Sequence, residues 1–421
     1  MNEILKIIVE RVNAVNNKSG FLDVIFGSYK QKALNGAPVV LFGAGALGEE
    51  LCTTLRHNGV SPLYFCDNND SRSGSSYCGI PIVTFDELKK LHKDSLIVIA
   101  IQKYSDAVVK QLLENGFCTD MIFCKDSGAY TNLAFMYSMV GTQNLISDYK
   151  KQHGSLALID FVMQNEEKVS EAYHLFADQK SKELFISKLA LIASDGNFEL
   201  FKDFMLSFSE PINEFGFFKY EGTPEDYYYF NNDVLSLSQN EVYVDVGAYD
   251  GDTVETFVQA CDKNQVKYKH IYAFEPDPQC YRSLVKNTAA HKNISCHQLG
   301  LGLQSGVLRF MSSNNAVHDQ AGAISKTGDI EIQVVTLDDF IQCEEVSFIK
   351  MDPGGNIIPD VIKGAANTIA KYKPKLALGA YHSLEAIFEI PLLVKSIYPD
   401  YKLYLRHNTF HLSDTALYAT V

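Results

Sequence analysis

The chain has 421 residues, 46% of them apolar, so it can bury well-packed interiors and is long enough for two or three domains. Its 37 basic and 51 acidic residues give a formal net charge of −14, which argues against nucleic acid as a partner. Continuous apolar runs such as "LIVIAI" at residues 96–101 are far shorter than the roughly 20 residues of a membrane helix, so we expect no membrane span.

The first residues, "MNEILKIIVERVNAV", place their apolar side chains on one helical face and lack a small-residue cleavage site. They predict an N-terminal helix within residues 1–36 and not a secretion signal. The nine cysteines form no CxxC pair, and most lie inside apolar runs. We therefore expect a protein of the reducing cytoplasm, without structural zinc or another bound metal.

Residues 37–128 alternate between strands and helices. A strand at residues 39–42, a glycine loop, a helix and a strand at residues 63–66 form one βαβ unit. The alternation continues through a short helix near Phe85 and a strand at residues 96–101 to a helix that ends near Gly116, which is followed by "MIFC" at residues 121–124. This pattern predicts a small Rossmann-like domain with a parallel sheet of about four strands.

The glycine loop of this unit, "LFGAGALGEEL", carries Gly43, Gly45 and Gly48 at the spacing of a dinucleotide-binding loop. Asp67 ends the next strand, 19 residues after Gly48. An NAD-dependent oxidoreductase or epimerase is therefore one alternative function of the chain. Because the unit is short and offers only one acidic partner, we predict weak or no NAD binding.

Residues 129–235 show helical spacings and hardly any strand alternation, which predicts a helical linking region. The region ends in the aromatic segment "FGFFKYEGTPEDYYYF" at residues 215–230. Such a cluster is more typical of a core between domains than of a lid over a ligand.

Residues 236–421 return to alternation. We expect strands at residues 242–246, 270–274, 294–299, 346–351 and 376–381, most of them separated by helices. The final segments, "YKLYLRHN" and "TALYATV", predict an antiparallel pair.

A second glycine loop lies in "VYVDVGAYDGDT" at residues 242–253. Such a turn exposes backbone N–H groups to an anionic ligand, but Asp245, Asp250 and Asp252 would repel a pyrophosphate at close range. They favour a ligand with a sulfonium and an α-ammonium group. Asp252, with Glu255 three residues later, equally predicts a helix start of the capping-box type.

Glu275 ends the next strand, "HIYAFE", about 30 residues after Asp245. An acid at such a strand tip can accept hydrogen bonds from both hydroxyls of a ribose. A solvated loop acid is the alternative interpretation.

The segments "VYVDVGAYDGDT", "AFEPDP", "VTLDDF", "FIKMD", "KPKLALGAYH" and "YKLYLRHN", in this order, resemble the FkbM family of S-adenosylmethionine-dependent methyltransferases over residues 236–421. The resemblance implies a class I methyltransferase fold, with a mostly parallel seven-stranded sheet whose last strand is antiparallel. It implies O-methylation of sugars or other hydroxyls, and we expect the acceptor to be a sugar or glycan precursor. The residues expected to bind S-adenosylmethionine are Asp245, Gly247, Tyr249, Asp252 and Glu275, with Gly300 and Leu301 near the adenine.

Two residues at the tips of later strands are the expected catalytic groups. Asp352 ends "FIKMD" and His382 ends "LALGAYH", and both would lie at the carboxyl edge where open α/β sheets bind ligands. Methyl transfer needs a hydroxyl in line with the methyl group and often a base for its proton. A structural, hydrogen-bonded His382 is an equally weighted alternative.

The segment after Asp352 departs from the family pattern, because "DPGGNIIPD" replaces the glutamates usually found there with residues such as Gly354. A degenerate methyltransferase that serves as a binding or assembly module is therefore a second alternative. Upstream, "FCDNNDSRSGSSYCGIPIVTFDEL" resembles the N-terminal Rossmann-like domain of some FkbM-type proteins.

The sequence thus predicts a cytoplasmic α/β protein with two Rossmann-like domains joined by a helical region. Its predicted activity is methyl transfer to a small-molecule or glycan acceptor. Homo-oligomer formation, the identity of the acceptor and the occupancy of the first loop stay open.

Overall fold

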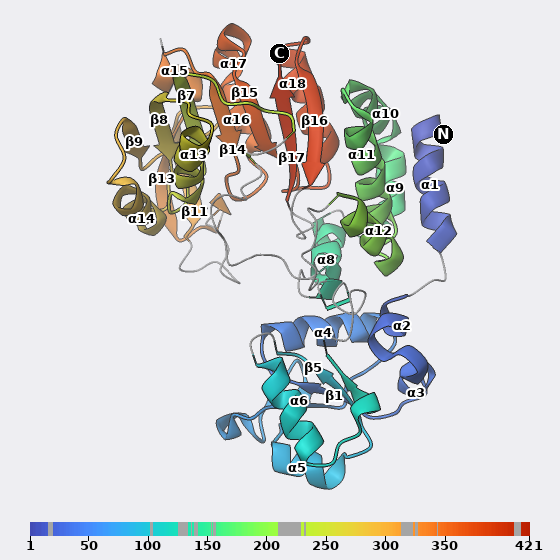
Figure 1. Ribbon diagram of the computed structural model, residues 1–421. Coiled ribbons are helices and arrows are strands. Elements are labelled where there is room, and N and C mark those ends of the chain that lie inside the picture. Colours follow the sequence, from blue (N-terminus) through green and yellow to red (C-terminus); the bar gives the residue numbers. More distant parts are fainter. Residues whose placement is uncertain are drawn as a thin grey trace.

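The structure, a computed structural model, describes residues 1–15, 20–101, 104–124, 134–135, 137–138, 142–152, 154, 157–208, 229–230, 233–312, 323–324, 327–342, 344–407 and 414–421. It consists of two α/β parts and a group of helices beside the C-terminal sheet (Figure 1). No helix in these ranges combines the length and the apolar run of a membrane span.

The predicted N-terminal helix is three α-helices and a short 3-10 turn. Its elements are α1 (Glu3–Val15), α2 (Gly20–Phe26), η1 (Gly27–Tyr29) and α3 (Lys30–Leu34). The apolar face of α1 packs against α10 and α11 of the helical region, whereas α2 places Phe26 against Phe123 of the first α/β part. The start of the chain therefore bridges two parts of the molecule.

The first α/β part has six strands where the sequence predicts about four. Its elements are β1 (Val39–Phe42), α4 (Ala46–His57), β2 (Tyr64–Cys66), η2 (Asp70–Arg72), β3 (Ser76–Tyr77), β4 (Ile80–Val83), α5 (Phe85–Leu91), β5 (Leu96–Ile99), α6 (Ser105–Glu114), η3 (Thr119–Met121) and β6 (Ile122–Phe123). The strand order is β3-β4-β2-β1-β5-β6, and every pair is parallel except β3 with β4. The segment "MIFC" contains β6, whereas β3 and β4 were not predicted; β3 is only two residues long.

The middle of the chain is helical, as its spacings predict. It comprises α8 (Thr142–Gln152), α9 (Leu158–Gln164), α10 (Glu166–Leu175), α11 (Gln179–Ala193) and α12 (Phe198–Phe208). Of the aromatic segment 215–230, only Tyr229 and Phe230 are among the described residues, and both are buried.

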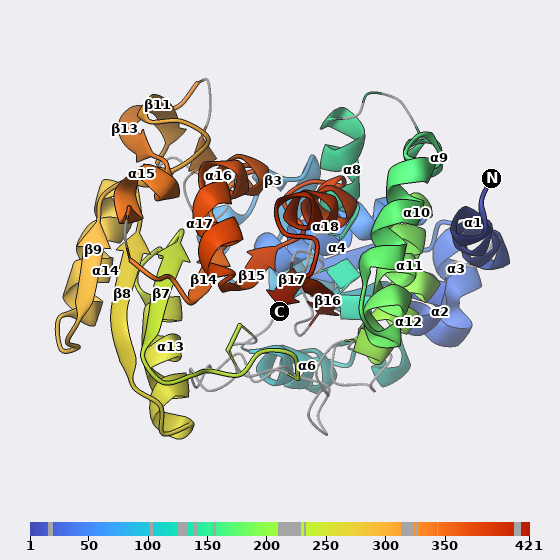
Figure 2. The same ribbon diagram turned by 90° about the horizontal axis from the view of Figure 1, so that it is seen from above.

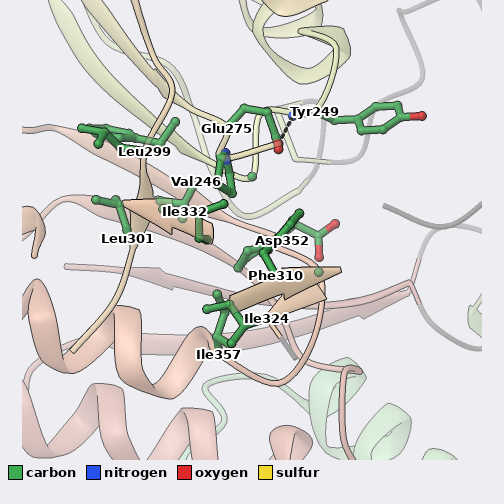
Figure 3. A pocket seen from close by; sticks show the side chains of 16 residues that line it. Val246, Tyr249, Glu275, Leu299, Leu301, Phe310, Ile324, Ile332, Asp352 and Ile357 are labelled. Carbon is green, nitrogen blue, oxygen red and sulfur yellow. Dashed lines mark hydrogen bonds between the residues drawn. The ribbon is translucent and has the colours of Figure 1, made fainter. Parts of the chain in front are cut away.

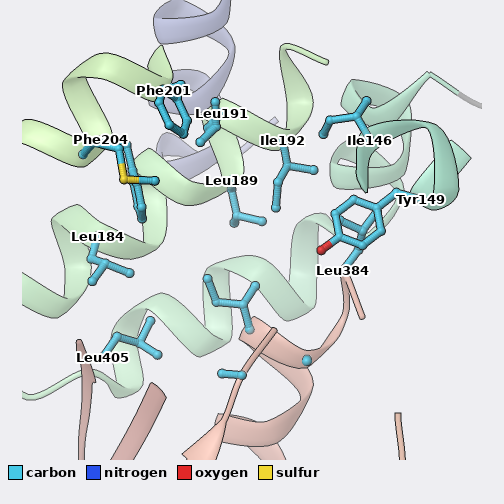
Figure 4. Packing of buried hydrophobic residues seen from close by; sticks show 14 of the residues in the cluster. Ile146, Tyr149, Leu184, Leu189, Leu191, Ile192, Phe201, Phe204, Leu384 and Leu405 are labelled. Atoms are coloured by element: carbon cyan, nitrogen blue, oxygen red, sulfur yellow. The ribbon is translucent and has the colours of Figure 1, made fainter. Parts of the chain in front are cut away.

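The helices cover the edge strand β16 (Lys402–His407) of the C-terminal sheet in both views (Figures 1 and 2). The Arg406 side chain, 3% exposed, makes bidentate contacts with Asp178 before α11 and with Asp233. Figure 4 shows Leu184 and Leu189 of α11 in one apolar cluster with Leu405. Helices and sheet therefore share a core, so an isolated C-terminal fragment would expose this surface.

The C-terminal sheet has seven strands in the order β16-β17-β15-β14-β7-β8-β9. Its strands and covering helices are β7 (Glu241–Val246), α13 (Asp252–Lys263), β8 (Tyr268–Phe274), α14 (Pro278–Thr288), β9 (Ile294–His297), β14 (Phe348–Met351), α16 (Ile358–Gly364), α17 (Ala366–Tyr372), β15 (Lys375–Gly379), α18 (Ala386–Ile397), β16 and β17 (Thr415–Thr420). Only β17 runs antiparallel to its neighbours. The predicted mostly parallel sheet with an antiparallel last strand is confirmed.

A second, four-stranded sheet was not predicted. It is formed by β10 (Gly300–Leu301), β11 (Gly306–Met311), β12 (Ala323–Ile324) and β13 (Ile330–Val335) and is followed by α15 (Leu337–Ile341). Most residues of β11 are exposed, so the strand lacks the buried apolar run by which the main strands are recognised in the sequence.

Candidate active site

A cavity lies at the carboxyl ends of β7, β8 and β14, where ligands bind in open α/β sheets (Figure 3). Six of the nine predicted site residues line it, namely Gly247, Tyr249, Glu275, Gly300, Leu301 and Asp352. Asp245, Asp252 and His382 do not line the cavity. The structure thus separates the predicted residues into an inner group and a supporting group.

The loop after β7 is held by the neighbouring strands. Gly247 has a φ of +76°, and a Cβ atom there would lie 2.7 Å from Cα of Pro353. The N–H groups of Gly247 and Ala248 both donate to the carbonyl of Phe274, at 3.1 and 3.0 Å. Glycine is therefore required by both the backbone conformation and the close approach of the loop after β14.

Asp245 supports this loop from below. It is fully buried, and its Oδ1 lies 3.0 Å from the ammonium of Lys350, which also donates to the carbonyl of Gly247 at 2.9 Å. The hydroxyl of Thr253 donates to the other carboxylate oxygen at 2.5 Å. Asp245 consequently acts on the conformation of the loop and has no side-chain surface in the cavity.

Lys350 was missed by the sequence reasoning. It is 2% exposed, in a strand whose four residues are all buried. Burial alone would lower its pKa, but the carboxylates of Asp245, Asp352 and Asp252 raise the pKa above its ordinary value. The side chain is therefore an ammonium ion. The signal was a lysine inside "FIKM", because a strand covered on both faces leaves a lysine no route to solvent and requires a buried partner.

The predicted capping box at Asp252 is wrong. Asp252 is the first residue of α13, the N-cap is Gly251 with a φ of 95°, and no side chain caps the helix. The carboxylate of Asp252 instead accepts the N–H of Thr253 at 2.6 Å. A capping side chain must belong to the residue before the helix, and here that residue is a glycine in the left-handed conformation.

Glu275 is the acidic group at the rim of the cavity. Its two carboxylate oxygens accept the backbone N–H of Tyr249 at 3.0 Å and of Asp277 at 2.8 Å, and the residue is 7% exposed (Figure 3). Burial raises the pKa of Glu275 to about 7, although these two hydrogen bonds oppose the shift. The second lone pair of each oxygen can still accept a hydroxyl.

The walls of the cavity are apolar. They are formed by Val246, Phe274, Leu299, Leu301, Phe310, Ile324, Ile332 and Ile357. The strands β10, β11, β12 and β13 thus supply one wall, which the sequence did not predict. The cavity measures about 60 Å³, so a nucleoside would extend beyond it toward the rim at Tyr249 and Glu275.

Asp352 also lines the cavity, and three side chains contact its carboxylate. Its Oδ1 accepts the hydroxyl of Tyr381 at 2.8 Å and contacts Nε2 of His382 at 2.9 Å, and its Oδ2 accepts the hydroxyl of Tyr229 at 2.9 Å. Burial would raise the pKa of Asp352, but the hydrogen bond and charge of His382, with Lys350 and Tyr381, hold it below its ordinary value. The predicted pair Asp352 and His382 is thus brought into contact.

This packing depends on Gly379, because a Cβ atom there would lie 2.6 Å from Oδ1 of Asp352. Tyr229 was missed as a site residue, since the sequence gives no sign that a residue before β7 reaches the tip of β14. Within the described residues, no group of three or more His, Cys, Asp or Glu side chains could hold a metal ion.

The first glycine loop borders a cavity of about 400 Å³, with Asp67 and Arg72 among its lining residues. The N–H of Ala44 donates to the carboxylate of Asp67 at 3.2 Å, and the guanidinium of Arg72 donates to the carbonyl of Ala44. Two backbone groups of this loop are therefore already bound by side chains of the same domain.

Comparison with known proteins identifies the C-terminal part. Residues 245–412 match the family model described as methyltransferase FkbM domain, and residues 36–123 match the family model described as C2185-like, N-terminal. A search of curated proteins found no match.

Among solved structures, methyltransferase FkbM from Methylobacillus flagellatus KT is similar over 99% of both chains, with 19% identity and a TM-score of 0.59. Fibrillarin of Aeropyrum pernix, solved with natively bound S-adenosyl-L-methionine, matches 44% of this chain and 70% of its own, with 11% identity and a TM-score of 0.28. The chain therefore contains a methyltransferase FkbM domain at residues 245–412, and its fold is similar to that of an FkbM methyltransferase.

Proposed function

We propose that the protein is an S-adenosylmethionine-dependent methyltransferase that methylates a hydroxyl group, on a sugar or glycan precursor. The observation that carries the proposal is the carboxylate of Glu275 at the rim of an apolar cavity, directly beside the glycine loop after β7. The FkbM domain match over residues 245–412 supports the same reaction.

The donor set of the cavity fits the nucleoside part of this cofactor. Glu275 would accept the ribose hydroxyls, and the apolar walls, including Leu301 and the backbone at Gly300, would enclose the adenine. Asp245 would act indirectly, through the loop that it braces. Asp252 would add negative charge near the methionine ammonium without contacting the cavity.

The cofactor, when bound, supplies an already activated methyl group, so the protein must position a hydroxyl and accept its proton. Nε2 of His382 lies 2.9 Å from Oδ1 of Asp352, and a hydrogen bond donated from Nε2 to this carboxylate would leave Nδ1 as the nitrogen that can accept a proton. We assign proton acceptance to His382 and orientation of its ring to Asp352.

Binding of S-adenosylmethionine by the full-length chain, measured by calorimetry, tests the cofactor. Transfer of a radiolabelled methyl group to a panel of nucleotide sugars and free glycans tests the reaction and the acceptor class. Absence of binding at millimolar cofactor would overturn the assignment.

All eight cysteines in the described residues are free thiols, which supports the proposed cytoplasmic location.

A binding or assembly module is the second candidate, and the segment after Asp352 favours it. Gly354 and Ile357 line the cavity where the family usually carries glutamates, and Asp352 is already engaged by three donors. A module would bind cofactor but methylate no acceptor of the panel. Activity that arises only in Gly354→Glu would support the module, whereas activity of the natural protein would exclude it.

A further inference from the structure

Tyr229 reaches the tip of β14 from outside the matched methyltransferase domain. It precedes residues 245–412 by 16 positions and lies 12 positions before the start of β7. Its side chain is nevertheless 1% exposed, and its hydroxyl donates to Oδ2 of Asp352 at 2.9 Å. A residue separated by 123 positions in the sequence thus contacts a predicted catalytic carboxylate.

The ring of Tyr229 also covers the buried ion pair beneath the glycine loop. The ammonium of Lys350 lies 5.7 Å from the ring centroid, within the range of a cation–π contact. The same ammonium binds Asp245 and the carbonyl of Gly247. Tyr229 therefore contacts both the catalytic carboxylate and the cation that supports the cofactor loop.

The position of Tyr229 is fixed by the next residue. The ring of Phe230 packs against Phe257, Tyr243 and Phe348, with centroid separations of 5.2, 5.5 and 5.5 Å. These rings belong to α13, β7 and β14, the elements that form the site. Phe230 therefore anchors the segment that carries Tyr229.

We propose that Tyr229 is a positioning residue of the methyl-transfer site, which holds the Asp352 carboxylate in the orientation that fixes His382. The inference deepens the proposed function and rests on it for the reaction. It extends the functional site beyond the methyltransferase domain into the segment that joins this domain to the helices.

The distribution of donors over the two oxygens of Asp352 explains why the hydroxyl of Tyr229 matters. Tyr381 and His382 both bind Oδ1, whereas Tyr229 binds Oδ2. Without the hydroxyl of Tyr229, the carboxylate could rotate about its Cβ–Cγ bond, and Oδ2 could bind a proton. A donor on each oxygen fixes the plane of the carboxylate and favours its ionised form. Lys350 on β14 also lowers the pKa of Asp352, and Asp414 before β17 acts on Tyr381.

Substitution of Tyr229 by Phe in the full-length chain tests the proposal without knowledge of the acceptor. Loss of the hydroxyl should raise the pKa of Asp352 by about 1 unit, because a hydrogen bond to the charged form is removed. Carboxyl ¹³C NMR of protein labelled at aspartate measures this pKa, and Asp352→Asn assigns the resonance. Tyr381→Phe, which removes a donor from Oδ1, shows the size of shift that one hydroxyl produces.

Phe230→Leu is the matched control for packing. It should lower the melting temperature, whereas Tyr229→Phe should raise the pKa of Asp352 and leave the melting temperature nearly unchanged. An unchanged pKa of Asp352 in Tyr229→Phe, with a shift in Tyr381→Phe, would overturn the proposal.

Activity and cofactor binding separate this inference from the proposed function. On an acceptor from the panel, Tyr229→Phe should reduce turnover at least about 10-fold and keep the affinity for S-adenosylmethionine within twofold. Equal turnover of Tyr229→Phe and the natural protein would overturn the positioning role and leave the methyltransferase assignment standing. Absence of cofactor binding in the natural protein would overturn the methyltransferase assignment, while the pKa measurement would still decide whether Tyr229 orients Asp352.

Discussion

The two glycine loops of the chain are built alike. In each, a glycine with positive φ follows a central strand, and its missing Cβ makes room for the loop after the adjacent strand: Gly43 against the carbonyl of Ala100 and Gly247 against Pro353, both at 2.7 Å. In each, an acid at the tip of the next strand accepts a backbone N–H of the loop, Asp67 from Ala44 and Glu275 from Tyr249. Loop geometry therefore does not distinguish their ligands.

The surroundings of the two loops differ in charge. Beneath the second loop, Asp245 of β7 lies in register with Lys350 of β14, whereas the corresponding pair beneath the first loop is Leu41 with Val98. In front of the first loop, Arg72 pairs with Asp67 at 3.5 Å and covers the carbonyl of Ala44. The charged groups, and not the glycine spacing, therefore distinguish the two loops.

The largest expected effect comes from removing the cation under the second loop. Lys350→Met leaves the Asp245 carboxylate buried without a counterion and should destabilise the protein by about 3–5 kcal/mol at pH 8. Burial raises the pKa of that carboxyl above its unfolded value, so this loss grows as pH rises and shrinks as pH falls and Asp245 becomes protonated. Denaturant unfolding at several pH values measures the loss of stability and its dependence on pH.

The double variant Asp245→Asn/Lys350→Met is its control and should recover most of the lost stability. Val98→Ala at the corresponding position of the first sheet should show no such pH dependence. A pH-independent loss in Lys350→Met would contradict the buried ion pair.

Substitution of either loop glycine comes next in size. Gly43→Ala and Gly247→Ala should each cost about 2–4 kcal/mol, since both combine positive φ with a backbone contact at 2.7 Å. Gly45→Ala is the matched control, because nothing lies within 4 Å of a Cβ atom there. Only Gly247→Ala should also weaken S-adenosylmethionine binding. Loss of that binding in Gly43→Ala alone would reverse the assignment of the loops.

Substitutions of the two acids at the strand tips should affect the affinity for the cofactor differently. Glu275→Ala should weaken S-adenosylmethionine binding by about 1.5–3 kcal/mol, the range for hydrogen bonds to a charged group. Asp67→Ala should leave it unchanged. Calorimetry on both full-length variants measures the difference, and an unchanged affinity of a folded Glu275→Ala protein would remove Glu275 from the site.

The smallest expected effect is the pH dependence of cofactor affinity. Because burial raises the pKa of Glu275 to about 7 and ribose hydroxyls bind its ionised form, affinity should be about tenfold weaker at pH 6 than at pH 8. Glu275→Gln should lack this component, which separates it from the titration of the cofactor itself. Without cofactor, the folding stability depends on pH in the opposite direction to cofactor affinity. The protonated carboxyl of Glu275 contributes to stability at low pH, and this contribution is lost as pH rises through about 7.

Much of this arrangement could be predicted from the sequence. Strand periodicity located the seven-stranded sheet, and the position of Asp352 and His382 at two strand tips predicted that both lie at its carboxyl edge, where the structure brings them into contact. What could not be predicted depends on tertiary contacts. The partner of Lys350 is set by the register of β14 with β7, and the approach of Tyr229 to Asp352 by the packing of Phe230 on three distant elements.

The cavity wall formed by the second sheet could not be predicted, because its strands lack the long apolar runs by which strands are recognised in the sequence. These strands, β10, β11, β12 and β13, are defined by their pairing. The weak NAD binding predicted for the first loop stays a prediction, and the contacts of Asp67 and Arg72 with Ala44 support it.

The central claim is that the second loop binds the cofactor and the first does not. Amide hydrogen exchange of the full-length chain, with and without saturating S-adenosylmethionine, tests it most directly because it reports each loop separately. The account predicts slower exchange at residues 245–252 and 299–301, including the amide of Tyr249, and no change at residues 43–48. Protection at residues 43–48, or unchanged exchange throughout at millimolar cofactor, would contradict it.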